Sequence, residues 1–254
     1  MARVLVTGSA DGLGKMAAQL MVAAKHRVVL HARSRERAAE ALAAVPGAET
    51  ALVGDLSSIR ATRELADQVN GLGALDAVIH NAAVGYRERH ILTVDGLPHV
   101  FAVNTLAPYI LTALIAKPKR LVYLSSGLHR QGDASLHDLL WEKRAWNGLN
   151  AYADTKLHDV ILAFAVARKW PDVLSNALEP GWVATWMGGP GAPDDLEAAP
   201  QTQVWLATSD EPAARVTGQY FYHMKRRASE PAAADPAIQE RLLAECARIS
   251  GVTI

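Results

Sequence analysis

Several common features are scarce or missing in this sequence of 254 residues. Its single cysteine, Cys246, excludes an intramolecular disulfide and a cysteine-rich zinc site, and we expect no metal. Its 26 Lys and Arg residues balance 26 Asp and Glu residues, so charge gives no sign of a nucleic-acid partner. No long apolar run or leader pattern is visible, and we expect a cytoplasmic protein that does not enter a membrane.

Apolar residues, by contrast, are abundant and regularly arranged. They make up 50% of the chain, enough for a large core. Short apolar runs at 4–6, 28–30, 51–53, 77–79, 121–124, 174–178 and 218–224 read as buried strands. Helical patterns occupy 13–24, 35–44, 58–69, 97–115, 152–169, 202–208 and 236–249. This alternation predicts a Rossmann-type, doubly wound α/β fold over 1–254, with about seven mostly parallel strands and helices on both faces.

The turn after the first strand is rich in glycine. Residues 7–14 read TGSADGLG and open the first helix. Glycines there permit a tight turn and let the backbone approach a pyrophosphate, which the helix N-terminus attracts. We therefore expect a dinucleotide site, with contacts from Gly8, Ser9, Asp11, Gly12 and Leu13.

The end of the second strand bears on the choice of dinucleotide. Sites for NAD place a carboxylate there, whereas NADP needs a cation for its 2′-phosphate. The chain reads His31-Ala32-Arg33 and has no acid at this point. Since a guanidinium pairs well with phosphate, we expect Arg33 to favour NADP(H) over NAD(H).

A tyrosine and a lysine stand four residues apart in Tyr152-Ala153-Asp154-Thr155-Lys156. On a helix they share one face, so a phenol would lie beside an ammonium group. A nearby cation favours the phenolate and would bring Tyr152 into a useful range for acid/base catalysis.

Together, the T-G-x-x-x-G-x-G turn and Tyr-x-x-x-Lys resemble the short-chain dehydrogenase/reductase family over nearly the whole chain. This resemblance implies further cofactor contacts, which also include Tyr152 and Lys156. The others are Asp55, Leu56, Asn81, Ala82, Ala83, Pro180, Gly181 and Val183. Two positions depart from the usual Asn-Asn-Ala-Gly motif: His80 precedes Asn81, and Ala83 replaces glycine.

The resemblance also implies a catalytic group of Asn104, Ser126, Tyr152 and Lys156. Tyr152 would donate a proton to the carbonyl oxygen during ketone or aldehyde reduction, and Ser126 would orient that oxygen. Lys156 would stabilise the phenolate and hold the nicotinamide ribose, while Asn104 would position a relay water. The reverse path would oxidise an alcohol.

The segment 127–150 reads as an insertion before the catalytic helix, with a short amphipathic helix expected over 136–141. Thr93-Val94-Asp95-Gly96 and the Ser125–His129 segment resemble retinol-dehydrogenase-like members of the family. The substrate would be a small carbonyl compound or alcohol, hydrophobic in character. We expect a lid over 186–201, with Gly188–Gly191 as its mobile part. The candidate substrate contacts are Ser126, Tyr152, Tyr86, His129, Trp182 and Trp186, with Trp146 and Met187 as further candidates.

Two other functions share parts of this pattern. An NADP-binding redox sensor could use the same fold without turnover, although such proteins commonly lose the tyrosine or lysine. A nucleotide-sugar epimerase or dehydratase also uses Tyr-x-x-x-Lys, but with a tighter glycine turn and a longer chain. A Ser-His hydrolase is excluded because no G-x-S-x-G motif is present. A homo-oligomer is compatible with the family resemblance.

Overall fold

The computed structural model describes all 254 residues and has one central sheet in the order β3-β2-β1-β4-β5-β6-β7-β8. Its strands are β1 (Arg3–Val6), β2 (Arg27–Ala32), β3 (Thr50–Val53), β4 (Ala77–His80), β5 (Arg120–Leu124), β6 (Leu174–Glu179), β7 (Tyr220–Tyr222) and β8 (Lys225–Arg226). The first seven pair in parallel, as predicted, and the short β8 adds an antiparallel edge.

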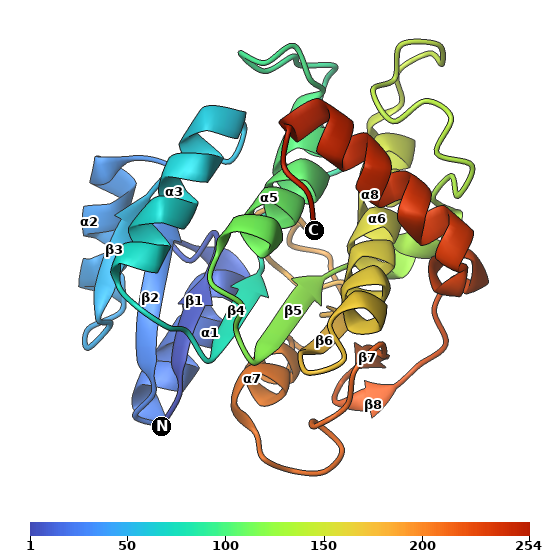
Figure 1. Cartoon of the computed structure of the whole chain (residues 1–254). Helices are drawn as coiled ribbons and strands as arrows, with labels where there is room; N and C mark the ends of the chain where they lie inside the picture. Colours follow the sequence, from blue (N-terminus) through green and yellow to red (C-terminus); the bar gives the residue numbers. More distant parts are fainter.

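Helices cover both faces of this sheet. They are α1 (Gly12–Ala23), α2 (Arg35–Ala44), α3 (Ile59–Gly71), α4 (His99–Phe101), α5 (Ala107–Leu114), α6 (Gly148–Lys169), α7 (Gln201–Thr208) and α8 (Pro236–Ser250). A π-helical segment, η1 (Ala102–Leu106), joins α4 to α5, and η2 (Gly127–Gln131) and η3 (Pro231–Ala234) are short 3-10 segments. Figure 1 shows α3, α5 and α6 side by side across one face of the sheet.

The core is divided by the sheet because successive strand residues point to opposite faces. Leu5 joins the larger cluster, on the side of α3, α5, α6 and α8, whereas Val4 and Val6 join the smaller cluster beside α1, α2 and α7. The residues of strand β5 alternate in the same way: Tyr123 belongs to the larger cluster and Val122 to the smaller one. These fully buried strands explain the continuous apolar runs in the sequence.

Local side chains set where several helices begin. The hydroxyls of Ser34 and Ser58 accept from backbone N–H groups in the first turns of α2 and α3, and Asn147 and Asp235 do the same for α6 and α8. Helix α8 ends at Ser250, and the following Gly251 has a φ of 68°, in the left-handed region that glycine tolerates. No helix is long and apolar enough to cross a lipid bilayer.

The expected helix over 136–141 was wrong. The segment forms turns, and Leu136 and Trp141 both have a φ of 55°, which a right-handed helix does not allow. Asp138 explains the difference, because its carboxylate accepts hydrogen bonds from the backbone N–H groups of Glu142, Lys143 and Arg144. A side chain that satisfies nearby backbone donors competes with helix formation.

The strand order places the ligand-binding edge. From β1 the chain continues to β2 and β3 on one side, and then crosses to β4 on the other. Ligands in open α/β sheets bind where the order reverses, at the carboxyl ends of the strands. The predicted glycine turn after β1 and the residues after β4 and β5 therefore meet at one edge.

Candidate active site

The glycine turn between β1 and α1 is packed too closely for a side chain at Gly8 or at Gly14. Gly8 has a φ of 63°, and a Cβ there would lie 2.8 Å from the Cα of Ala82. A Cβ on Gly14 would collide with the side-chain nitrogen of Asn81 and with the carbonyl oxygen of Gly8. Gly12 also has a positive φ, 52°, but a Cβ there would meet open space. The turn therefore leaves its outer surface free.

The N-terminus of α1 differs from those of α2, α3, α6 and α8, because its N-cap residue makes no side-chain cap. Asp11 instead reaches away to Arg37, at 2.6 Å. The first-turn N–H groups of α1, including that of Leu13, have no partner within the helix. Unpartnered N–H groups at a positive helix end suit a pyrophosphate, so the turn fits a dinucleotide cofactor.

His31 supports this turn from beneath, a role that the sequence pattern did not reveal. Its Nδ1 accepts from the N–H of Gly8 at 3.0 Å, and its Nε2 lies 2.9 Å from the carbonyl oxygen of Gly54. Burial lowers the pKa of His31, which favours the neutral ring that this pattern of one acceptor and one donor needs. The hydroxyl of Ser9 accepts from the His31 N–H, so this predicted cofactor residue turns its side chain inward.

The residues after β4 also brace the turn. Asn81 donates from Nδ2 to the carbonyl oxygens of Thr7 and Gly8, at 2.9 and 3.2 Å. The N–H groups of Asn81 and Ala82 both donate to the Thr7 hydroxyl at 3.0 Å, and the half-buried Ala83 follows. The structure thus brings these three predicted residues to the glycine turn, with Asn81 as its main support.

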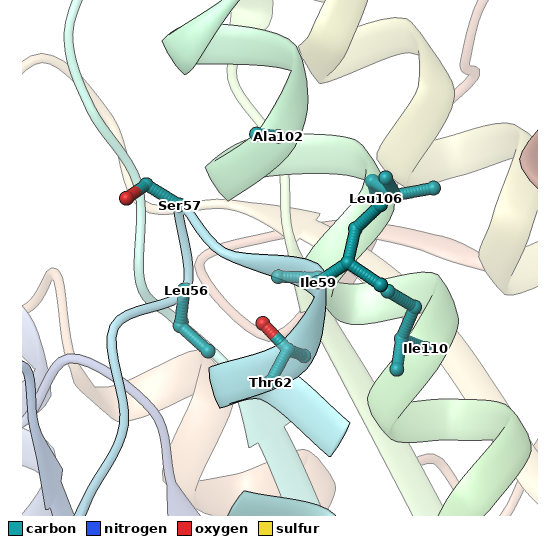
Figure 2. A pocket seen from close by; sticks show the side chains of 8 residues that line it. Leu56, Ser57, Ile59, Thr62, Ala102, Leu106 and Ile110 are labelled. Atoms are coloured by element: carbon teal, nitrogen blue, oxygen red, sulfur yellow. The ribbon is translucent and has the colours of Figure 1, made fainter. Parts of the chain in front are cut away.

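Three residues predicted to contact the cofactor follow the carboxyl ends of β2 and β3. Arg33 is exposed and makes no salt bridge, whereas Arg37 is paired with Asp11 and Glu40. Asp55 is exposed, and its carboxylate accepts from the N–H of Ser57. Leu56 is buried and helps to line an apolar crevice between the start of α3 and the η1–α5 segment (Figure 2).

Tyr152 and Lys156 share a face of α6, as predicted. Tyr152 is 7% exposed and Lys156 is 3% exposed. The ammonium group of Lys156 lies 5.6 Å from the centre of the Tyr152 ring. It also donates to the carbonyl oxygen of Leu124 at 2.7 Å and to the carboxylate of Asp159 at 2.8 Å. The last contact was not foreseen from the sequence.

The pKa of Tyr152 is raised, in contrast to the lowered value expected from the neighbouring lysine. Burial is the largest effect; the Lys156 ammonium and the Ser126 hydroxyl oppose it, whereas the Asp159 carboxylate adds to it. The sequence indicated the cation but not the depth at which the phenol would lie.

Two serines follow β5 and have different roles. Ser125 is buried and donates from its hydroxyl to the carbonyl oxygen of Lys156 at 2.7 Å, which ties the strand to α6. Ser126 is only half-buried, and its hydroxyl accepts from the N–H of Leu128. The Ser126 hydroxyl also lowers the pKa of Tyr152. The end of β5 and helix α6 therefore bring these two predicted catalytic residues close together.

Asn104 lies in the π-helical segment η1, a local distortion within the helix predicted over 97–115. Its Oδ1 accepts from the N–H of Val84 at 2.8 Å, and its Nδ2 donates to the Val84 carbonyl and to the Thr155 hydroxyl, at 3.1 and 3.0 Å. Such single-turn distortions are frequent at functional sites. Asn104 joins the loop after β4 to the helix of Tyr152, and the relay water stays a prediction.

The segment after β6 folds back on itself. Gly181 has a φ of 92°, and a Cβ there would lie 2.7 Å from the Asp194 carboxylate. That carboxylate accepts from the N–H of Trp182, and Val183 forms a β-bridge with Asp194. The half-buried Pro180 and the buried Val183 thus begin a closed loop beside the site.

Two loops approach each other near Tyr152. The ring of Tyr86 meets that of Tyr152 edge to face, with 6.0 Å between centres. A Cβ on Gly85 would lie 2.9 Å from Cγ of Met187, so the loop after β4 contacts the loop after β6. Trp182 is 56% exposed and donates to the carbonyl of Gly188, whereas Trp186 is fully exposed.

His129 and Trp146 are both hydrogen-bonded to backbone groups of the loops around the site. His129 is fully buried; its Nδ1 contacts the carbonyl oxygen of Ser126 at 2.7 Å, and its Nε2 accepts from the N–H of Glu230. Burial lowers the pKa of His129 to about 4. Trp146 donates to the carbonyl of Glu88 and stacks on a histidine of the same loop. Both residues therefore stabilise loops around the site.

Known proteins share the sequence pattern and the fold. A family model described as short chain dehydrogenase matches residues 2–128. The uncharacterised oxidoreductase AN7799 of Emericella nidulans is 44% identical, over 100% of this chain and 99% of its own. Human retinol dehydrogenase 13 is 32% identical, over 98% of this chain and 84% of its own.

A crystal structure of an uncharacterised protein from Mycobacterium paratuberculosis superposes with a TM-score of 0.86, at 22% identity, over 100% of this chain and 94% of the other. At that identity the superposition supports the fold alone. With the sequence matches, which span the glycine turn and the Tyr152 helix, it leads to one assignment: the chain belongs to the short-chain dehydrogenase/reductase family of oxidoreductases.

Proposed function

We propose that this protein is an NADP(H)-dependent carbonyl reductase that also catalyses the reverse oxidation of an alcohol. The observation that carries the proposal is the meeting of Ser126, Tyr152 and Lys156 at the carboxyl edge of β5, with the cation 5.6 Å from the phenol ring. A buried phenol between a cation and a hydroxyl is suited to giving and taking a proton.

The cofactor choice is supported by Arg33. Its guanidinium is exposed and has no carboxylate partner, so it is available to a phosphate group. The strand before it ends at Ala32, which offers no carboxylate to the hydroxyls of an NAD ribose. We therefore place the 2′-phosphate of NADP at Arg33 and its pyrophosphate at the start of α1.

Each catalytic residue has one task. When bound, the cofactor supplies hydride for carbonyl reduction or accepts it in alcohol oxidation. Tyr152 gives its phenolic proton to the substrate oxygen, and Ser126 donates a hydrogen bond to the same oxygen. Lys156 stabilises the phenolate, and Asn104 fixes the loop at Val84 against α6.

The substrate side is formed by the loops that meet between Gly85 and Met187. We propose that Tyr86, Trp182 and Trp186 contact the substrate and that the loop 186–201 closes over it. Aromatic and thioether groups around one phenol favour a bulky hydrophobic ketone or aldehyde. The proposed contacts exclude His129, which is fully buried and hydrogen-bonded.

The test is NADPH oxidation, followed by absorbance, against a panel of aromatic and aliphatic ketones, aldehydes and nucleotide-sugars. We expect turnover with hydrophobic carbonyl compounds and a preference for NADPH over NADH. Tight NADPH binding without any turnover would favour a redox sensor instead. Conversion of a nucleotide-sugar without net NADPH consumption would favour an epimerase.

A further inference from the structure

Lys156 has a partner that the proposed chemistry does not use. Its buried ammonium group donates to the Leu124 carbonyl and to Asp159, which leaves one of its three N–H groups free. Asp159 lies one turn later on α6 and is 2% exposed. Lys156 is the only group that hydrogen-bonds to this carboxylate.

Neither charge would be stable in this place alone. An unpaired ion in a protein interior loses its hydration, and the usual result is a shift toward the neutral form. Burial acts to lower the pKa of Lys156, but Asp159 and Tyr152 act more strongly together, and the pKa is raised. Burial raises the pKa of Asp159 to about 6, against the effect of Lys156.

Three buried titratable groups on β4, β5 and α6 carry no charge near neutral pH. Tyr123 of β5 is fully buried, with its pKa raised, and stacks against His80 of β4, whose pKa burial lowers to about 3. His158, also on α6, has a pKa lowered to about 3 and contacts the Thr105 hydroxyl. Asp159 is therefore the counter-charge of Lys156 near neutral pH, above its own pKa of about 6.

On the basis of the proposed function, we propose that Asp159 is a positioning residue of the proton-transfer site. Its carboxylate keeps the Lys156 side chain charged and seated at the Leu124 carbonyl, so that the cation beside Tyr152 is in place before cofactor or substrate binds. Replacement by asparagine retains the size and an acceptor oxygen but removes the charge. Without the Asp159 charge, the effect of burial on Lys156 is no longer offset. The pKa of Lys156 then falls, so its ammonium group loses its proton at a lower pH.

The first test needs no substrate. Lysine labelled with ¹³C at Cε is titrated by NMR, and the Lys156 signal is assigned by its loss in the double variant Lys156→Met/Asp159→Asn. We expect the midpoint to fall by at least about one pH unit in Asp159→Asn and to stay near the wild-type value in Asp159→Glu. An unchanged midpoint in Asp159→Asn would overturn the proposal.

The second test follows alcohol oxidation, which needs the phenolate that Lys156 stabilises. We expect the ratio of Asp159→Asn activity to wild-type activity to fall about tenfold between pH 7 and pH 10. A merely structural defect would give a ratio that does not change with pH, and this would contradict the proposal. Asp154→Asn is the matched control, since that buried carboxylate of α6 pairs with Arg144 and its ratio should be flat.

The two tests also separate this proposal from the function on which it rests. If the wild-type protein oxidises no alcohol and reduces no carbonyl compound, the proposed function fails. The NMR midpoint still decides whether Asp159 keeps Lys156 charged. If turnover is present and the midpoint does not move, only the role of Asp159 fails.

Discussion

Arg144 donates from Nη2 to the buried carboxylate of Asp154 at 2.9 Å, which joins the segment before α6 to the helix turn between Tyr152 and Lys156. The same guanidinium lies 3.9 Å above the ring of Trp141 and contacts Asp138. Asp154 also accepts from the N–H of Asp133. The segment before α6 thus supports this helix on the side away from Asp159.

Loss of this contact should destabilise the fold. Arg144→Met leaves the Asp154 carboxylate buried without its cation, and breaking one side of a buried pair is costly. We expect the free energy of unfolding in urea to fall by about 2 to 3 kcal/mol, somewhat below the usual cost because Arg144 is partly exposed. Arg60→Met removes a surface pair with Glu64 and should cost about 0.5 kcal/mol or less. Equal losses for the two variants would contradict the stabilising role of the Arg144–Asp154 contact.

Gly14 should tolerate no side chain although it lies in a helix. Alanine normally stabilises a helix over glycine by about 1 kcal/mol. At Gly14 a Cβ meets the Asn81 side chain and the Gly8 carbonyl, so the turn must move. We expect Gly14→Ala to weaken NADPH binding at least about tenfold, because the turn would no longer fit the pyrophosphate.

The control is Gly71→Ala at the end of α3, where a Cβ would meet nothing within 4 Å. Its NADPH affinity, measured by titration calorimetry, should equal that of the wild type. Wild-type affinity in Gly14→Ala would show that the packing of this turn does not govern cofactor binding.

Arg33 should decide between the two dinucleotides. Arg33→Asp replaces the cation that would bind a phosphate with a carboxylate that suits ribose hydroxyls. We expect the ratio of kcat/KM for NADPH to kcat/KM for NADH to fall at least about a hundredfold, since charge-assisted phosphate contacts are strong. Arg226→Asp, an exposed arginine on β8, should leave the ratio unchanged. An unaltered ratio in Arg33→Asp would remove the basis for assigning NADP(H).

Buried histidines should make the fold sensitive to acid. Burial lowers the pKa of His158 to about 3, below its unfolded value of about 6.5. Below pH 6.5 the unfolded chain therefore binds a proton there that the folded chain does not. Stability is lost as the pH falls, by about 1.4 kcal/mol per pH unit for each such group.

His158→Gln removes one of these groups. Between pH 6 and pH 4.5, its free energy of unfolding should decline less steeply than that of the wild type, by about 1 kcal/mol per pH unit. His137→Gln, at an exposed histidine, should decline as the wild type does. If the His158→Gln and wild-type slopes agree, His158 is not held neutral by the fold.

The features that the sequence revealed are those encoded by short spacings. The parallel strands, the glycine turn and the shared face of Tyr152 and Lys156 depend on neighbours within a few residues. Contacts between distant segments were not visible in this way. His31 bracing Gly8, and the π-helical distortion that carries Asn104, arise from packing between elements.

Asp159 illustrates a second limit. Its spacing from Lys156 is as local as that of Tyr152, yet a carboxylate three residues after a lysine is common on exposed helices. Only burial of both groups gives the pair its significance, and burial depends on the complete fold. The helix expected over 136–141 does not form for a related reason. The Asp138 carboxylate accepts hydrogen bonds from the backbone N–H groups of Glu142 and Arg144, which follow it in the chain.

The most direct measurement of the central claim compares Tyr152→Phe with the wild-type protein. The variant keeps the ring and loses the hydroxyl, so NADPH should bind as before while kcat for carbonyl reduction falls at least about a hundredfold. Tyr109→Phe, which loses a buried hydroxyl bonded to the Val252 carbonyl, controls for general effects on the fold. Near-wild-type kcat in Tyr152→Phe would contradict the account, because Tyr152 would then not be the proton donor.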